Sequence, residues 1–153
     1  MNHEIDSFDR KILNLLQQDG TLSVDKLSER VGLSRNACWR RVKWLEENGV
    51  LTGRVALIDA AKVGLPLLVY VLVRTNDHTP QWLKKFREAV SSAPEIISAQ
   101  RMTGDLDYVL RVRVADVKAY DAFYQRLIAN VPIADVSASF VMEDMKETTV
   151  LVV

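Results

Sequence analysis

The sequence predicts an α+β protein: an N-terminal winged helix-turn-helix of three helices, followed by a C-terminal ferredoxin-like βαββαβ domain. Two patterns support this prediction. Up to residue 49, apolar residues recur at helical spacing between capping residues and glycines. Beyond residue 66, apolar strands alternate with two amphipathic helices. We expect the boundary near residue 60, which gives one domain of residues 1–60 and a second of residues 61–153.

Three helices are expected in the N-terminal domain. The first begins after Asp6, a residue suited to an N-cap, and ends at the turn signal Asp19-Gly20. The second follows Ser23 and is closed by Gly32, and the third runs from Ser34 to Gly49. Two helices joined by a tight turn have the layout of a helix-turn-helix, in which one helix supports the other in the DNA major groove.

The third helix is expected to have a buried side and a DNA-facing side. Cys38, Val42 and Leu45 are spaced four and three residues apart, which places them on one buried stripe. On this stripe, Cys38 is expected to pack as a small apolar residue rather than to act as a redox sensor. The other faces carry arginine, asparagine and lysine, which pair with guanine, adenine and phosphate, respectively. The predicted DNA-binding residues are Ser23, Ser34, Arg35, Asn36, Trp39, Arg40, Arg41 and Lys43.

Two of these residues have a second interpretation. Arg41 lies between the two sides, so it either contacts DNA or pairs with Glu46 or with an acid of the first helix. Trp39 either faces the DNA or packs against the first helix. The alternative for the whole set is an ordinary solvated helix face, but the turn, the caps and the local charge favour contact with DNA.

The charge distribution restricts how DNA is bound. The chain has a formal net charge of zero and a pI of about 6.7, which does not indicate a protein that coats nucleic acid in general. Residues 34–54 nevertheless hold five basic and two acidic residues, whereas residues 59–153 hold 11 basic and 12 acidic residues. This local surplus is modest, so we expect one copy to bind weakly and a dimer to bind through doubled contacts.

The second half is predicted to contain elements in the order β-α-β-β-α-β. The expected strands cover residues 67–74, 95–102, 107–114 and 136–142, and the expected helices begin at Pro80 and after Asp116. The two helices would cover one face of an antiparallel sheet, and we expect the other face to be buried in a dimer. Two more β-prone segments are predicted as a wing or connecting strand (residues 50–58) and as a short fifth strand (residues 148–153).

Other classes of protein are not supported by the sequence. Cys38 is the single cysteine, so a disulfide-stapled secreted fold is excluded. No apolar run approaches the ~20 residues that span a membrane, and no signal peptide is recognisable, so we expect a cytoplasmic protein. His3 and His78 are isolated and form no metal-ligand cluster. No G-x-S-x-G, P-loop or dinucleotide motif indicates a cofactor or a catalytic site, so we do not expect an enzyme.

Motifs in both halves resemble the Lrp/AsnC family of transcription regulators, also described as leucine-responsive/asparagine or feast/famine regulators. The N-terminal motifs are IDSFDRKILNLLQQDG, LSERVGLS and RRVKWLEENGVL, and the C-terminal motifs are TGDLDYVLRV and FVMEDMKETT. The resemblance covers essentially the whole chain. It implies dimers that form through the C-terminal sheet, assemble further to tetramers or octamers, and bind a pseudo-palindromic operator. It also implies a small effector, usually an amino acid, that binds where dimers meet and switches transcription.

The resemblance assigns an effector site as well. The TGDLDY segment is similar to the family's effector loop, and Thr148 and Thr149 match the position that closes the pocket from a neighbouring subunit. From spacing alone, the loop is a polar hairpin turn and the two threonines are ordinary strand residues. The implied effector-binding residues are Met102, Thr103, Gly104, Asp105, Asp107, Tyr108, Thr148 and Thr149. Cys38-Trp39-Arg40-Arg41 is similar to a branch of the family associated with cysteine sensing.

Two other functions stay open at the level of sequence. One is an architectural DNA-binding protein without a ligand response, which the net charge of zero disfavours. The other is a regulatory subunit of an amino-acid metabolic enzyme, because ferredoxin-like domains also occur in such enzymes. The helix-turn-helix pattern argues against the second of these.

Overall fold

The computed structural model describes residues 4–153, which form two compact units. The first contains the residues up to Leu57 together with Lys146–Val153, and the second contains Ile58–Met145. His3, one of the two histidines considered above, lies outside the described residues. Among residues 4–153, no helix combines the length and the apolar character that crossing a membrane requires.

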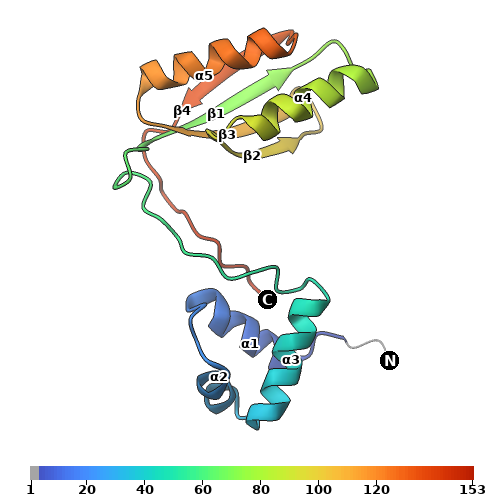
Figure 1. The fold of residues 1–153 in the computed structure, drawn as a ribbon, viewed down its shortest axis with the longest axis vertical. Coiled ribbons are helices and arrows are strands. Elements are labelled where there is room, and N and C mark those ends of the chain that lie inside the picture. The colour runs from blue at the N-terminus through green and yellow to red at the C-terminus, as the bar shows by residue number, and fades with distance from the viewer. Residues whose placement is uncertain (1–3) are drawn as a thin grey trace. The chain divides into compact units, whose positions relative to one another are not determined.

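The first unit contains the three predicted helices, α1 (Ser7–Gln18), α2 (Val24–Val31) and α3 (Arg35–Glu47) (Figure 1). The predicted N-caps Asp6, Ser23 and Ser34 each accept a hydrogen bond from a backbone N–H of the following turn. The apolar sides of the helices meet in one core, whose fully buried members are Ile12, Leu27, Cys38 and Leu45. The three-helix prediction is therefore confirmed, including the buried stripe on α3.

The turn between α2 and α3 depends on Gly32. Its φ of 77° lies in the left-handed region, where a residue with a Cβ atom is strained. In this conformation, the N–H groups of Gly32 and Leu33 donate to the Ser28 carbonyl at 2.9 and 3.0 Å, respectively. Gly32 thus ends α2 and directs the chain into α3, as the sequence predicts.

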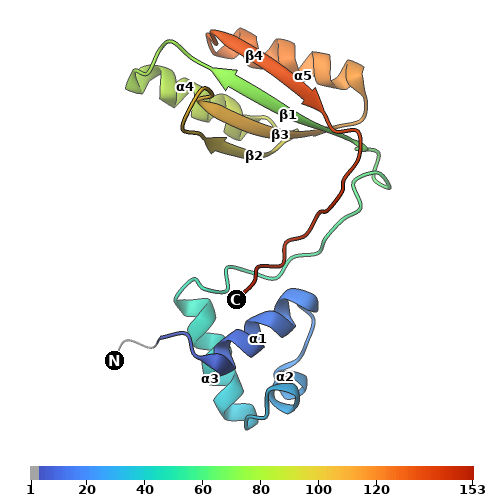
Figure 2. The same cartoon turned by 180° about the vertical axis from the view of Figure 1, so that it is seen from behind.

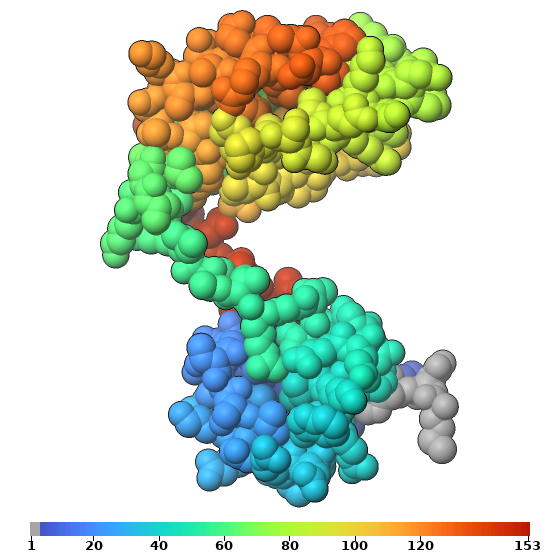
Figure 3. Space-filling view, viewed as in Figure 1, coloured from blue at the N-terminus to red at the C-terminus, as the bar shows by residue number. Residues whose placement is uncertain are grey.

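The second unit is an antiparallel sheet with two helices on one face. Its strands are β1 (Leu67–Arg74), β2 (Ile96–Arg101), β3 (Tyr108–Val114) and β4 (Asp135–Phe140), in the order β2-β3-β1-β4. Helices α4 (Pro80–Ser92) and α5 (Val117–Asn130) cover the same face, which Figure 3 shows in space-filling form. Figure 2 shows that no helix covers the opposite face. This is the predicted βαββαβ arrangement.

The alternation of side chains along β1 explains why one face is buried. Val69 and Val71 point toward the helices and pair with Val112 and Leu110 of β3, and none of these four is exposed. Aromatic residues of the helices, among them Phe123 of α5, complete this core. The side chains between them on β1, such as Tyr70, face the uncovered side and remain half-buried.

Two segments with strand-like sequence are not strands. Residues 50–58 and 148–153 carry no strand assignment, so the predictions of a connecting strand and of a fifth strand are wrong for this chain by itself. The C-terminal segment belongs to the first unit, where Gln17 Nε2 donates to the Leu151 carbonyl at 3.0 Å and the Leu151 N–H donates to Gln17 Oε1 at 2.6 Å. A β-prone segment becomes a strand only when a partner strand pairs with its backbone N–H and C=O groups. Here, the Gln17 side chain bonds these groups at Leu151 alone.

Candidate functional site

The side of α3 opposite the buried stripe carries the candidate DNA-reading residues. Asn36 and Arg40 are exposed, and the side chain of neither forms a hydrogen bond or ion pair with another residue of 4–153. Lys43 pairs weakly with Glu47 at 3.6 Å, and both side chains are exposed. Free amide and guanidinium donors on an exposed helix face match the groups that read base edges.

Trp39 is exposed next to this side, and Arg35 is exposed as the first residue of α3. The Trp39 side chain is 48% exposed, and Lys43 Nζ lies 5.1 Å from its ring centroid, which keeps the aliphatic stem of the lysine near the indole. Of the two interpretations of Trp39, exposure on the α3 surface is therefore the one observed. Arg35 Nε forms an exposed ion pair of 2.7 Å with Asp25 of α2, which water and salt screen, so the guanidinium can exchange this partner for a phosphate.

The two serines predicted to touch DNA are helix caps. Ser23 Oγ accepts from the Lys26 N–H at 3.3 Å, and Ser34 Oγ accepts from the Ala37 N–H at 3.3 Å. Capping leaves a hydroxyl proton free on each serine, and both side chains sit where a helix begins. Each can cap its helix and still donate to a phosphate.

Arg41 has a role inside the domain. Its Nη1 atom lies 2.9 Å from Oδ1 of Asp9 and 2.9 Å from Oδ2 of Asp6, and its guanidinium carbon lies 5.4 Å from the Phe8 ring centroid. The pairing with an acid of the first helix, given above as the alternative for Arg41, is confirmed. The guanidinium is committed to these carboxylates, so the geometry does not support Arg41 as a reader of bases.

The carboxylates that hold Arg41 are themselves locked in a reciprocal capping box. Asp6 accepts from the Phe8 and Asp9 N–H groups at 2.9 and 3.0 Å, and the Asp6 N–H donates to Asp9 at 3.1 Å. Asp9 has no exposed surface. A buried carboxylate needs a charged or hydrogen-bonding partner, and Arg41 supplies the charge from α3. Asp9 is not among the residues predicted above to be functional, although the Asp-x-x-Asp spacing at the start of α1 is a sequence signal for it.

Cys38 is buried on α3, beside Val42 and Leu45. Burial raises the pKa of its thiol, and the nearby positive charge of Arg41 offsets this only in part. A thiol with a raised pKa holds little thiolate, the reactive form. The prediction that Cys38 packs in the core is confirmed, and the raised pKa of its thiol agrees with a structural role.

The candidate effector loop, residues 102–107, is a tight connection between β2 and β3. The Met102 N–H donates to the Asp107 carbonyl at 2.8 Å, and the Asp107 N–H donates to the Val73 carbonyl at 3.0 Å. Arg74 Nε donates to the Asp105 carbonyl at 2.8 Å. Gly104 takes a φ of 101°, which only glycine adopts without strain. The loop is therefore tied to β1 by one backbone bond to Val73 and by the Arg74 side chain.

Within this loop, the two aspartates differ. The Asp107 carboxylate accepts from the N–H of the buried Thr75 at 2.8 Å, so it serves to join the loop to the end of β1. The Asp105 carboxylate is exposed and makes no ion pair or hydrogen bond with residues 4–153. Asp105, rather than Asp107, is thus the acidic group available to a ligand. Thr148 and Thr149 are exposed and belong to the first unit, whereas the loop belongs to the second.

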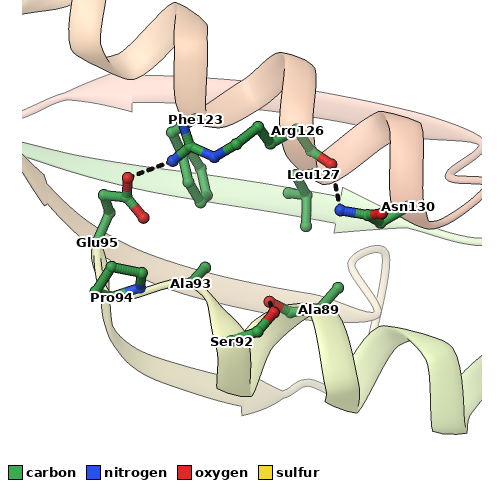
Figure 4. A pocket seen from close by; sticks show the side chains of 9 residues that line it. All are labelled: Ala89, Ser92, Ala93, Pro94, Glu95, Phe123, Arg126, Leu127 and Asn130. Carbon is green, nitrogen blue, oxygen red and sulfur yellow. Dashed lines mark hydrogen bonds and ion pairs between the residues drawn. The ribbon is translucent and has the colours of Figure 1, made fainter.

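A small cavity of about 180 Å³ lies between the C-terminal ends of α4 and α5 (Figure 4). Glu95 and Arg126 form an ion pair across its mouth, and Asn130 donates to the Arg126 carbonyl at 2.9 Å. The polar groups of this cavity are largely used within the chain. None of the residues predicted to bind DNA or effector lines it.

Comparison with known proteins identifies the two units. The family model for a winged helix-turn-helix DNA-binding domain matches residues 5–52, and that for the Lrp/AsnC ligand binding domain matches residues 68–151. The chain is 49% identical over 148 residues to the DNA-binding transcriptional activator DecR of Escherichia coli, covering 96% of this chain and 97% of that protein. The chain belongs to the Lrp/AsnC family. This Lrp/AsnC protein is a DNA-binding transcriptional regulator.

Solved structures of the family share the fold along nearly the whole chain. An AsnC family transcriptional regulator from Agrobacterium tumefaciens is 53% identical, with a TM-score of 0.91 and coverage of 95% of both chains. A transcriptional regulator from Neisseria meningitidis, solved as a complex with L-Met, is 34% identical, with a TM-score of 0.91 and coverage of 97% of this chain and 96% of that one. The regulator described here therefore has the family's fold in both units.

We predict that Arg41→Met strongly destabilises the first unit, because it leaves the Asp9 carboxylate buried without the guanidinium. The expected loss is about 3–5 kcal/mol, measured as the opening free energy of α1 and α3 amides by hydrogen exchange. Arg40→Met is the matched control, since Arg40 is the exposed neighbour without a partner, and it should change the opening free energy by less than about 0.5 kcal/mol. Equal effects of the two variants would contradict the assigned role of Arg41.

We also predict an acid-dependent contribution from Asp6. Hydrogen bonding from the Asp9 backbone N–H, aided by Arg41, lowers the pKa of Asp6 from its usual value in the folded state. The stabilisation is therefore complete above the unfolded pKa of about 3.9, and it is lost as the pH falls through the lower folded pKa. Asp6→Asn keeps the cap but cannot titrate. Thermal unfolding between about pH 5 and pH 2 should show a shallower loss of stability in this variant. Parallel curves for the two proteins would refute this.

Proposed function

We propose that the regulator reads its operator with the exposed face of α3, using Arg35, Asn36, Trp39, Arg40 and Lys43. The observation that carries this proposal is the pair of unpartnered donors, Asn36 and Arg40, directly opposite the buried stripe. Arg40 supplies two donors for a guanine edge, Asn36 supplies one donor and one acceptor for an adenine edge, and Arg35 and Lys43 supply charge for phosphates. Arg41 is a positioning residue in this proposal, since it ties α3 to α1.

We further propose that a dimer forms through the uncovered sheet face and presents two copies of α3 to a pseudo-palindromic operator. This face carries half-buried apolar side chains such as Tyr70 and Leu72, with the Arg111 guanidinium 6.0 Å from the Tyr70 ring centroid. Burying it in a second copy removes apolar surface from water. Two recognition helices then contact half-sites separated by about 34 Å, one turn of DNA. We also propose that these dimers assemble further to tetramers or octamers and that the regulator acts in the cytoplasm.

The second unit is proposed to bind an amino-acid effector at the loop of residues 102–108. The Neisseria meningitidis relative was solved with L-Met, and a Mycobacterium tuberculosis feast or famine regulatory protein, 28% identical, was solved with L-Methionine. In this chain, Asp105 offers an exposed carboxylate to the ligand ammonium, and Gly104 leaves its backbone open to close approach. Thr148 and Thr149 of a neighbouring subunit are proposed to donate to the ligand carboxylate.

The proposed switch is thermodynamic linkage. An effector that binds one assembly or conformation more tightly than another shifts the population toward it and changes DNA affinity by the same free energy. No catalytic step is proposed, since the relatives with matching chains are named as transcriptional regulators.

We predict that Arg40→Ala with Lys43→Ala weakens operator binding by about 10–100-fold, because one base contact and one phosphate contact are lost. The probe is a duplex selected from a random pool by the wild-type protein, and affinity is measured by fluorescence anisotropy. Arg10→Ala with Lys11→Ala removes the same charge from the exposed side of α1 and should leave affinity nearly unchanged. Undiminished binding by the α3 variant would overturn the assignment of the DNA face.

We predict that Asp105→Asn abolishes the effector response and leaves operator affinity intact. A thermal-shift screen of the twenty amino acids should first find at least one that stabilises the wild-type protein by mass action. Asp105→Asn should lose this stabilisation, whereas Asp121→Asn on the exposed side of α5 should retain it. Asp107→Ala is unsuitable, because it also breaks the bond to Thr75. If no amino acid stabilises the protein, or Asp105→Asn responds normally, the proposed effector site is wrong.

A further inference from the structure

A second recess in the C-terminal unit has features of a ligand site. It is a groove of about 370 Å³ between α4 and β2, the strand at the edge of the sheet. Leu83 and Phe86 form its apolar wall on α4, and Tyr108 of β3 packs against Phe86 with ring centroids 4.6 Å apart. Its volume falls within the range of about 300–1,000 Å³ that is typical of small-molecule sites.

The groove exists because Ala99 fills little space. Ala99 pairs with Leu110 across the ladder and shares its face of the sheet, the face that α4 and α5 cover. Leu110 is completely buried there, yet Ala99 is exposed. At the edge strand, a methyl group does not reach the helix, so the space above it stays open. A leucine at this position would occupy the groove.

Two guanidinium groups border the groove without a counter-charge. Arg87 comes from α4, and Arg101 comes from β2, two residues beyond Ala99 on the same face. Neither forms an ion pair or hydrogen bond with another residue of 4–153, and no carboxylate lines the groove. Other cations of these helices do have partners: Lys84 lies 4.0 Å from Glu88, and Arg126 pairs with Glu95.

We propose that this groove binds a small monocarboxylate with an apolar tail, such as an aryl or branched-chain organic acid. The two arginines bind the carboxylate through charge-assisted hydrogen bonds, and the tail lies along Leu83 and Phe86 over the Ala99 methyl group. The lining contains no carboxylate that could pair with an α-ammonium group. The expected ligand is therefore a carboxylic acid that has no ammonium group. This separates the groove from the proposed amino-acid site, although Tyr108 borders both.

The experiment uses three probes with one phenyl group and different head groups: phenylacetate, 2-phenylethanol and phenethylamine. Their binding to the full-length protein is measured by NMR titration. Phenylacetate should bind saturably and perturb amides of α4 and β2, and the alcohol and the amine should bind at least about tenfold more weakly, because only the acid pairs with the arginines. Equal binding of all three probes, or no saturable binding of phenylacetate, would overturn the proposal.

Variants locate the site independently of the probes. Arg87→Gln with Arg101→Gln should weaken phenylacetate binding by about tenfold or more, and Lys85→Gln, another exposed cation of α4, should not. Ala99→Leu should abolish binding by filling the groove. If Ala99→Leu does not fold, the Arg87→Gln, Arg101→Gln variant alone tests whether the groove binds phenylacetate. Asp105→Asn should bind phenylacetate normally, which separates this test from that of the effector loop. Unchanged phenylacetate binding by the Arg87→Gln, Arg101→Gln variant would refute the proposal. If the wild type does not bind phenylacetate and Ala99→Leu changes the oligomeric mass, the groove is instead a contact with another copy of the chain.

Discussion

The arrangement of the DNA-binding unit depends on one buried ion pair, between Asp9 of α1 and Arg41 of α3. Asp9 has no exposed surface, and its charge is stabilised by the Arg41 guanidinium 2.9 Å away and by the Asp6 N–H. The pair joins the first turn of α1 to the middle of α3, and the capping box with Asp6 fixes the carboxylates in turn. Because Arg41 occupies the border between the two sides of α3, holding it inward fixes the rotation of the helix about its axis. That rotation buries Cys38 and exposes Asn36 and Arg40.

The second unit follows a different constraint, the one-sided cover of its sheet. Two helices bury the face that carries Val69, Val71 and Leu110, and they leave the other face without a helix. Within the same unit, α4 covers β2 incompletely because Ala99 is small, and the effector loop is tied to the end of β1 through Asp107 and Thr75. The same architecture thus leaves a sheet face, a loop and a groove accessible. The partners proposed for them are a second copy of the chain, an amino acid and a monocarboxylate, respectively.

The helices and strands could be predicted from the sequence where they depend on nearby residues. Helix boundaries followed from caps and glycines such as Ser34 and Gly32, and strand positions followed from alternation. The errors concern long-range partners. Residues 148–153 have strand propensity, but a strand needs a second backbone to pair with, which propensity does not report. A buried acid such as Asp9 looks like a surface residue until its partner 32 positions later is known. Local sequence likewise does not distinguish Asp107 from Asp105 as a ligand group, since the bond that occupies Asp107 comes from Thr75, 32 positions earlier.

In the proposed complex, α3 reads DNA with its exposed face while Arg41 stays bound to α1. The most direct measurement is an NMR titration of the ¹⁵N-labelled protein with its selected duplex, following the side-chain Nε–H signals of Arg40 and Arg41 separately. We expect a large shift for Arg40 and for the side-chain amide of Asn36. The Arg41 signal should keep its free-protein position and its slow hydrogen exchange with solvent. An Arg41 signal that moves with the DNA while Arg40 stays unchanged would contradict this proposal.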